Sequence, residues 1–199
     1  PLKDKVIKDY TRIDLCLPFI KRLIAKKAKI IIISHLGRPK KNKDPNLSLI
    51  PVYKYLKKTL QTNVYFFMGE FDEQVEDKFS HLKEGEVILI ENIRYFKEET
   101  EDEDNFSKKL GSLGDIYIND AFSCSHRSHA SVEGITKYIP SYFGLQITEE
   151  INALKKITSE IEKPVTLIIG GSKISTKIKI INNLIKKFNN IIIVGGMGN

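Results

Sequence analysis

The chain has 199 residues, of which 41% are hydrophobic and 29% charged, and its formal net charge is +7 at pH 7. These values are ordinary for a soluble globular protein, and no apolar stretch approaches the roughly 20 residues that a bilayer-spanning helix needs. No secretory signal is visible, and the only cysteines, Cys16 and Cys124, lie far apart. We therefore expect reduced thiols in a cytoplasmic protein with no membrane partner.

The first part of the chain alternates between two periodicities. Apolar residues at helical spacing predict a helix over residues 13–27, and a β-branched run predicts a strand over 29–34. A second helix is expected over 47–60, with Ser48 as a possible N-cap, and a second strand over 63–68.

The middle of the chain repeats this order. We expect a short helix over residues 72–79, a strand over 86–90, a helix over 105–113 and a strand over 116–118. The acidic run at 98–104 is expected to be a solvated loop and the start of the following helix, because acidic side chains favour the positive end of a helix.

The last part begins with a break at residues 139–144, which contain a proline and a glycine. A long helix is predicted over 145–161, then a strand over 165–169, a helix over 174–188 and a strand over 190–194. This alternation predicts an α/β fold, with a three-layer α/β/α, Rossmann-like lobe built on a parallel sheet and the beginning of a second similar lobe.

Arginine is scarce and unevenly placed. The sequence has five arginines, and three of them follow predicted strands: Arg38, Arg94 and Arg127. Ligands of parallel sheets bind outside the carboxyl ends of the strands, and the planar guanidinium grips carboxylate or phosphate with two hydrogen bonds. With His35 in the first of these loops and Arg12 within reach, we predict a basic cradle for a small phosphorylated acid. The alternative is a set of scattered salt bridges, for example between Arg127 and Asp120.

A different loop follows the strand at residues 165–169. Gly170, Gly171, Ser172 and Lys173 join it to the next helix, whose N-terminus suits a phosphate, and Lys177 lies one turn further on. The spacing is not that of a Walker A motif. By itself this turn is weak evidence for a ligand, and so are Gly195 and Gly196 after the last strand.

Four stretches together resemble the phosphoglycerate kinase family over essentially the whole chain. They are residues 34–39 (SHLGRP), 91–95 (ENIRY), 119–131 (NDAFSCSHRSHAS) and 170–177 (GGSKISTK). The resemblance implies a glycolytic, cytoplasmic and monomeric kinase that moves a phosphoryl group reversibly between ATP and the carboxylate of 3-phosphoglycerate. Its partners would be 3-phosphoglycerate or 1,3-bisphosphoglycerate and ATP or ADP, with Mg²⁺ carried by the nucleotide.

The same resemblance assigns the parts of the chain. Residues 1–143 would form the lobe that binds 3-phosphoglycerate, 144–161 the interlobe helix, and 162–199 an incomplete start of the nucleotide lobe. The implied substrate-binding residues are Arg12, His35, Arg38, Arg94 and Arg127. The implied nucleotide-binding residues are Gly171, Ser172, Lys173, Lys177, Gly195 and Gly196. Arg12 and Lys173 would stabilise the charge on the moving phosphoryl group.

The chain also departs from the family. It begins after the Asp and Asn of the family's first substrate motif, and its second lobe is short, so we expect a fragment that binds 3-phosphoglycerate weakly without turnover. The alternative is a non-catalytic α/β module that binds an acidic metabolite. In that case Lys173 and Lys177 would make no contribution to ligand affinity. A nucleic-acid-binding domain is disfavoured, because no basic helix or aromatic stacking set is visible.

Overall fold

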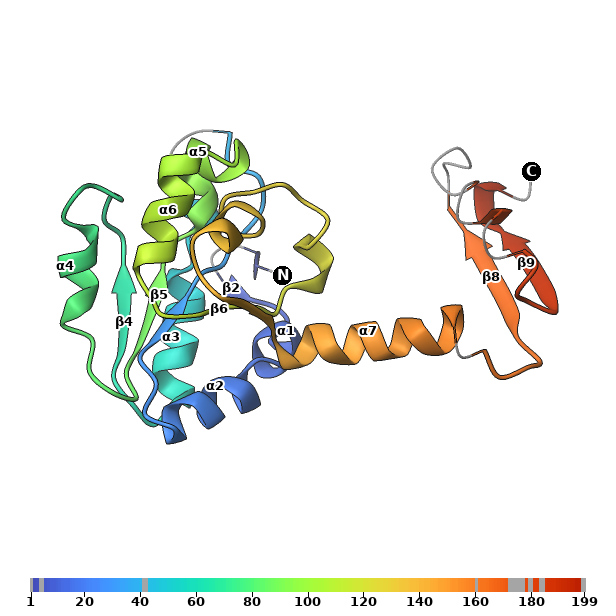
Figure 1. Cartoon of the computed structure of the whole chain (residues 1–199), viewed down its shortest axis with the longest axis horizontal. Helices are drawn as coiled ribbons and strands as arrows, with labels where there is room; N and C mark the ends of the chain where they lie inside the picture. Colours follow the sequence, from blue (N-terminus) through green and yellow to red (C-terminus); the bar gives the residue numbers. More distant parts are fainter. Residues whose placement is uncertain are drawn as a thin grey trace. The chain divides into compact units, whose positions relative to one another are not determined.

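The structure of the chain is a computed structural model that describes residues 2–3, 6–40, 43–159, 161–171, 178, 181–182 and 185–197. It divides into two compact units, Pro1–Ile147 and Thr148–Asn199. The first unit contains the following elements before the long helix α7 (Leu145–Thr158) begins (Figure 1): β1 (Leu2–Lys3), β2 (Val6–Ile7), α1 (Thr11–Asp14), α2 (Leu17–Ala25), β3 (Ile30–Ile32), α3 (Ile50–Thr59), β4 (Val64–Phe67), α4 (Val75–Ser80), β5 (Val87–Ile90), α5 (Lys97–Thr100), α6 (Asp104–Ser112), β6 (Tyr117–Asn119) and β7 (Ser141–Phe143).

A parallel three-stranded sheet in the order β3-β5-β4 forms the middle layer. All four residues of the central strand β5 are buried. Val87 and Leu89 pack into the cluster formed with α2 and α3, whereas Ile88 and Ile90 pack into the cluster formed with α4 and α6. A strand buried on both faces explains its unbroken apolar sequence.

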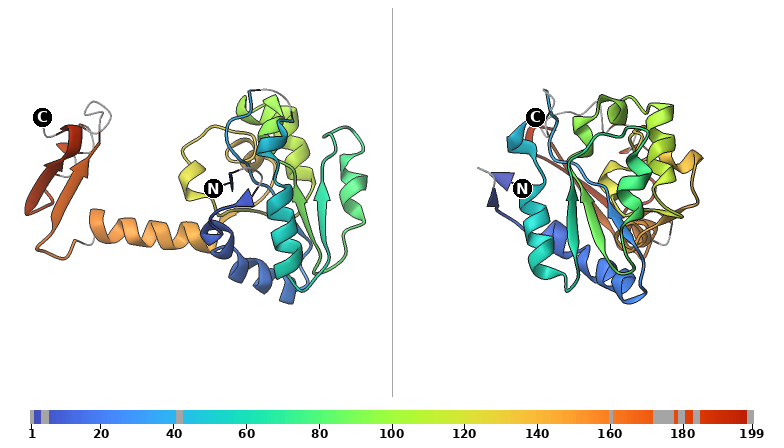
Figure 2. Two further views of the ribbon diagram at one scale, coloured as in Figure 1. Left: turned by 180° about the vertical axis from the view of Figure 1, so that it is seen from behind. Right: turned by 90° about the vertical axis from the view of Figure 1, so that its left-hand side faces the viewer.

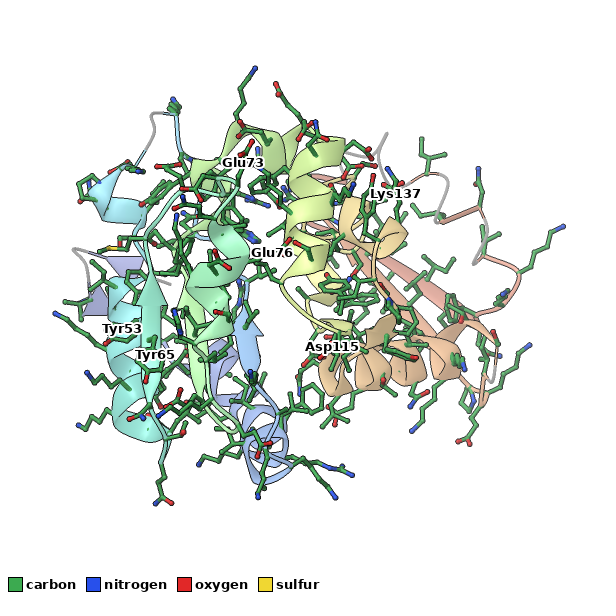
Figure 3. The ribbon with its side chains drawn as sticks, turned by 60° about the vertical axis from the view of Figure 1, so that its left-hand side comes forward. Tyr53, Tyr65, Glu73, Glu76, Asp115 and Lys137 are labelled. Atoms are coloured by element: carbon green, nitrogen blue, oxygen red, sulfur yellow. The ribbon has the colours of Figure 1, made fainter. Side chains whose placement is uncertain are left out.

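Helices therefore cover both faces of this sheet (Figure 2). Tyr53 of α3 and Glu76 of α4, labelled in Figure 3, come from helices on its two opposite sides. The predicted α/β fold with parallel strands and helices on both faces is confirmed.

Two local expectations were wrong near the first helices. The predicted helix over 13–27 is divided into α1 and α2, because Pro18 in the first turn of α2 has no backbone N–H to continue a helix from α1. Ser48 is not the N-cap of α3, which begins at Ile50. Its Oγ still accepts a hydrogen bond from Ile50 N at 3.2 Å, and its hydroxyl donates to Glu91 Oε2.

Three short strands, β1, β2 and β7, escaped the sequence patterns, whereas β6 was predicted over 116–118. β1 and β2 form an antiparallel pair of two residues each. The expected break at 139–144 contains β7, which pairs in parallel with β6 from Tyr117–Ser141 to Asn119–Phe143. Every residue of β7 is exposed, so no alternation of buried and exposed side chains marks it in the sequence.

In the second unit, β8 (Thr166–Gly170) and β9 (Asn190–Val194) form a parallel pair, as predicted for these two strands. Eight of the fifteen residues of the predicted helix over 174–188 lie outside the described residues; 178 and 181–182 are helical, whereas 185–187 form a turn, so the helix was predicted too long at its end. Among the helices that the structure describes, none combines the length and apolar character that crossing a bilayer requires.

Candidate functional site: a basic pocket

The loops after β3 and β5 are joined by the main chain and by one buried side chain. Ile93 N donates to Ser34 O at 3.1 Å. Asn92, which is fully buried, donates from Nδ2 to the carbonyls of Leu36 and Leu47 and accepts from Arg94 N. The position of Arg94 is thus fixed by an amide that satisfies the backbone of both loops.

A tight turn brings the two loops together again at Gly37. Its φ of +64° lies in the left-handed region, and a Cβ there would stand 2.8 Å from Leu47 Cδ2. The positive φ therefore favours glycine here, and a larger residue would also have to displace the Leu47 side chain. The Gly37 carbonyl accepts a hydrogen bond from Arg94 Nη1 at 2.9 Å, which orients the guanidinium.

These loops and the loop after β6 line a pocket of about 400 Å³. We call it the basic pocket; its lining residues are Arg38, Pro39, Lys40, Arg94, Tyr95, Lys97, Thr100, Arg127 and His129. None of them is acidic. The structure therefore brings together the three arginines that the sequence places after strands, at the carboxyl ends where ligands of parallel sheets bind.

The arginines of the basic pocket form no ion pair with a carboxylate among the described residues. The ion pairs found among the described residues involve lysine or histidine, not arginine. The alternative of scattered arginine salt bridges is therefore wrong in this part of the chain. The Nε atoms of Arg94 and Arg127 are buried without a hydrogen-bond partner among the described residues.

Besides lacking hydrogen-bond acceptors, the arginines of the basic pocket repel one another. Burial, followed by the neighbouring Arg127, lowers the pKa of Arg94. Buried donors that lack acceptors are rare in folded proteins, and cations without counter-charges repel one another. An anion that accepts several hydrogen bonds would satisfy both deficits at once.

His35 lies beside this pocket as an uncharged group. Burial, with Arg94, Arg127 and His129 nearby, lowers its pKa to about 4. Its imidazole is therefore neutral at pH 7 and can exchange a hydrogen bond but not supply a charge. Its Nε2 lies 4.0 Å from Cys124 Sγ.

A buried carboxylate lies in the acidic run that the sequence analysis assigned to solvent. Glu99 of α5 is only 2% exposed, so that expectation is wrong for this residue. It accepts hydrogen bonds from the backbone N–H and the hydroxyl of Ser131 and lies 3.3 Å from His129 Nδ1. Burial raises the pKa of Glu99, and the hydrogen bonds from Ser131 oppose that shift. No pattern in an acidic run distinguishes this buried member from its exposed neighbours.

Other predicted residues lie elsewhere. Arg12 is on α1, exposed and not part of the pocket lining. His129, which the sequence analysis did not count as a binding residue, does line it.

In the second unit, Gly171 follows β8 and Gly195 follows β9, both with positive φ. A Cβ on Gly195 would lie 3.8 Å from Gly171 N, so the two strand ends are close. Gly196 lies in the 3₁₀ turn Gly195–Met197. Ser172, Lys173 and Lys177 lie outside the described residues.

The fold and the pocket define an α/β protein whose parallel strands end at a cation-lined pocket. A family model described as phosphoglycerate kinase matches residues 1–199. The chain therefore belongs to the phosphoglycerate kinase family, as its motifs indicate.

Relatives and solved structures give the same result. The chain is 48% identical over all its 199 residues to a phosphoglycerate kinase of Wolbachia pipientis wMel, and 47% identical over 197 residues to one of Dictyoglomus turgidum. Each alignment covers 50% of the relative, so the chain spans about half the length of the curated relatives it matches. The structure of phosphoglycerate kinase from Coxiella burnetii is similar with a TM-score of 0.85 and 35% identity, over 98% of this chain and 49% of that one.

Proposed function

We propose that this chain carries the 3-phosphoglycerate-binding part of a phosphoglycerate kinase and the beginning of its nucleotide-binding part. The reaction of the whole protein would be reversible phosphoryl transfer between ATP and the carboxylate of 3-phosphoglycerate, giving ADP and 1,3-bisphosphoglycerate. The observation that carries the proposal is the pair of buried Nε atoms of Arg94 and Arg127, which have no hydrogen-bond partner in the described part of the chain, in a pocket lined by no acidic residue.

The chemistry of this reaction suits such a pocket. A carboxylate is already ionised at pH 7, so the attacking group needs no general base. What it needs is alignment and compensation of charge on the transferring phosphoryl group. In this proposal Arg38, Arg94 and Arg127 hold the phosphate and carboxylate of 3-phosphoglycerate, and neutral His35 contributes a hydrogen bond.

The remaining roles are proposed on the family resemblance. Arg12 would join the substrate cations and, with Lys173, stabilise the charge in transit. The nucleotide would be held by Gly171, Ser172, Lys173, Lys177, Gly195 and Gly196. Residues 1–143, 144–161 and 162–199 remain the proposed substrate lobe, interlobe helix and incomplete nucleotide lobe.

Mg²⁺ would arrive with the nucleotide phosphates, where it neutralises charge. Among the described residues no group of three or more His, Cys, Asp or Glu side chains could hold a metal ion. In this proposal Mg²⁺ is assigned to the nucleotide phosphates rather than to side chains of this chain. A cytoplasmic monomer is also proposed; the two free cysteines are consistent with a reducing compartment.

Calorimetric titration with 3-phosphoglycerate tests the proposal. We expect the chain to bind, Arg38→Met to weaken binding by about tenfold or more, and Arg22→Met on the exposed face of α2 to leave it unchanged. Equal affinity of the Arg38 and Arg22 variants would contradict the assignment. A second experiment adds the half of a full-length relative that this chain does not cover. If the chain binds 3-phosphoglycerate but this mixture shows no phosphoryl transfer, the result would favour the non-catalytic binding module.

A further inference from the structure

The carboxylate of Glu99 is tied to the loop that carries two pocket residues. Ser131 donates to it from its backbone N–H at 2.8 Å and from its hydroxyl at 2.7 Å. The Glu99 carbonyl accepts from Ala130 N at 2.9 Å. A carboxylate that is 2% exposed is costly to bury unless its oxygens are hydrogen-bonded, and here both are.

One of its contacts reaches the basic pocket. His129 lines the pocket, and its Nδ1 lies 3.3 Å from Glu99 Oε1, whereas Glu99 itself does not line it. When one ring nitrogen of a histidine is engaged by a carboxylate, the ring orientation is set and the other nitrogen is presented to a ligand. With Nδ1 engaged, that nitrogen is Nε2.

The contact also links two cation-bearing segments. Glu99 follows Arg94 by five residues on the segment after β5, and Ser131 follows Arg127 by four on the segment after β6. Arg94 is electrostatically stabilised by Glu99 and destabilised by Arg127. The same carboxylate therefore offsets part of the repulsion that Arg94 experiences from Arg127.

We propose that Glu99 is a positioning residue for the basic pocket: through Nδ1 it holds His129 with Nε2 directed to the bound anion. The inference rests on the proposed function only for the identity of that anion as 3-phosphoglycerate. The pairing of Glu99 with His129, and its effect on any oxyanion in the pocket, stands on the contacts alone.

A double-mutant cycle separates positioning from a purely structural role. Glu99→Gln keeps the side-chain shape and an acceptor for Ser131 N, but places an amide donor opposite the histidine. His129→Asn keeps a donor near the place of Nδ1 and removes Nε2. We expect Glu99→Gln to weaken 3-phosphoglycerate binding about tenfold, as partners behind ligand-binding groups do, and to cause no further loss in the His129→Asn background.

The control is Ser131→Ala, which removes a hydrogen bond to the same carboxylate and leaves His129 untouched. We expect it to change affinity by less than about twofold. An equal loss from Glu99→Gln in both His129 backgrounds would overturn the proposal, because Glu99 would then act without the histidine. No loss in either background would also overturn it.

Two further measurements distinguish a failure of the positioning role of Glu99 from a failure of the proposed function. Titration with inorganic sulfate tests the pocket without the carboxylate of the substrate. If sulfate shows the coupling and 3-phosphoglycerate does not bind, the proposed function fails and the positioning role stands; if neither anion binds the wild type, both fail. Nitrogen-15 spectra of the four histidine rings in the unliganded chain should show Glu99→Gln shifting His129 more than the other three, and an unshifted His129 would refute the pairing.

Discussion

Two pockets of nearly equal volume open in the first unit, and they differ in how their polar groups are satisfied. The basic pocket measures about 400 Å³ and the second about 410 Å³, and Tyr95 lines both. The second, which we call the apolar pocket, is lined by Lys43, Pro45, Ser48, Ile50, Pro51, Lys54, Phe67, Met68, Gly69, Ile90, Glu91, Tyr95 and Phe96.

The single carboxylate of the apolar pocket has its hydrogen bonds. Glu91 accepts from the hydroxyl of Ser48 and from the backbone N–H groups of Leu49 and Asn92. In the basic pocket, by contrast, two buried arginine nitrogens have no partner among the described residues. Volume therefore does not distinguish the two pockets as anion sites, whereas unmatched donors do, because a buried polar group without a partner is costly.

The comparison predicts where a lost cation matters most. Arg127→Met removes a half-buried guanidinium while keeping much of its volume, and we expect anion binding to weaken by about 30-fold or more, since hydrogen bonds to charged groups contribute about 1.5–3 kcal/mol. Lys54→Met at the apolar pocket should change affinity by less than about twofold. Calorimetric titration of both variants with 3-phosphoglycerate and with sulfate checks this. A larger loss in the Lys54 variant would reverse the assignment of the two pockets.

A second prediction concerns the supports of the two pockets. Asn92→Ala leaves the carbonyls of Leu36 and Leu47 without their buried donor, so we expect it to lower the free energy of unfolding by about 3 kcal/mol. Ser48→Ala removes one hydroxyl from the half-buried carboxylate of the apolar pocket and should cost about 1 kcal/mol. Urea unfolding measures both. Similar losses would mean that the amide of Asn92 is not what joins the loops of the basic pocket.

The strands and arginines that form the basic pocket could be predicted from the sequence, because the patterns that indicate them are local. The apolar run that became β5 and the scarcity of arginine outside strand-end loops can both be read without knowing the fold. The carboxyl ends of parallel strands meet at one edge, so residues after different strands could be expected to gather there.

The residues behind the pocket could not be predicted in this way, because their role depends on long-range contacts. Glu99 has the same local sequence character as exposed Glu98 and Glu101, and only the packing of Ser131 and His129 against it buries it. The separation of α1 from α2 at Leu15 and Cys16 did have a local signal in Pro18, but a proline is equally compatible with the first turns of a single helix over 13–27. The pattern records which face of an element is apolar, not which polar group finds a distant partner.

The smallest expected effect is a pH dependence of the free energy of unfolding. It should come from the basic pocket and its surroundings, since no histidine lines the apolar pocket. In the folded chain the pKa of His35 is about 4, below the ordinary value of 6.5. Between these values the unfolded chain binds a proton that the folded chain does not, so this contribution to stability is present above pH 6.5 and is lost as the pH falls toward 4. We expect wild type to lose stability more steeply than His35→Asn when urea unfolding is compared at pH 7.0, 5.5 and 4.5.

His81→Asn, which removes an exposed histidine outside both pockets, serves as the control and should follow the wild type. Parallel stability curves for wild type and His35→Asn would show that His35 is not held neutral. Saturating sulfate should reduce the difference in acid sensitivity between wild type and His35→Asn. The reason is that an anion bound between Arg94 and Arg127 weakens their electrostatic field at His35. Burial is the larger cause of the lowered pKa, however, so the anion should restore only part of the stability lost in acid.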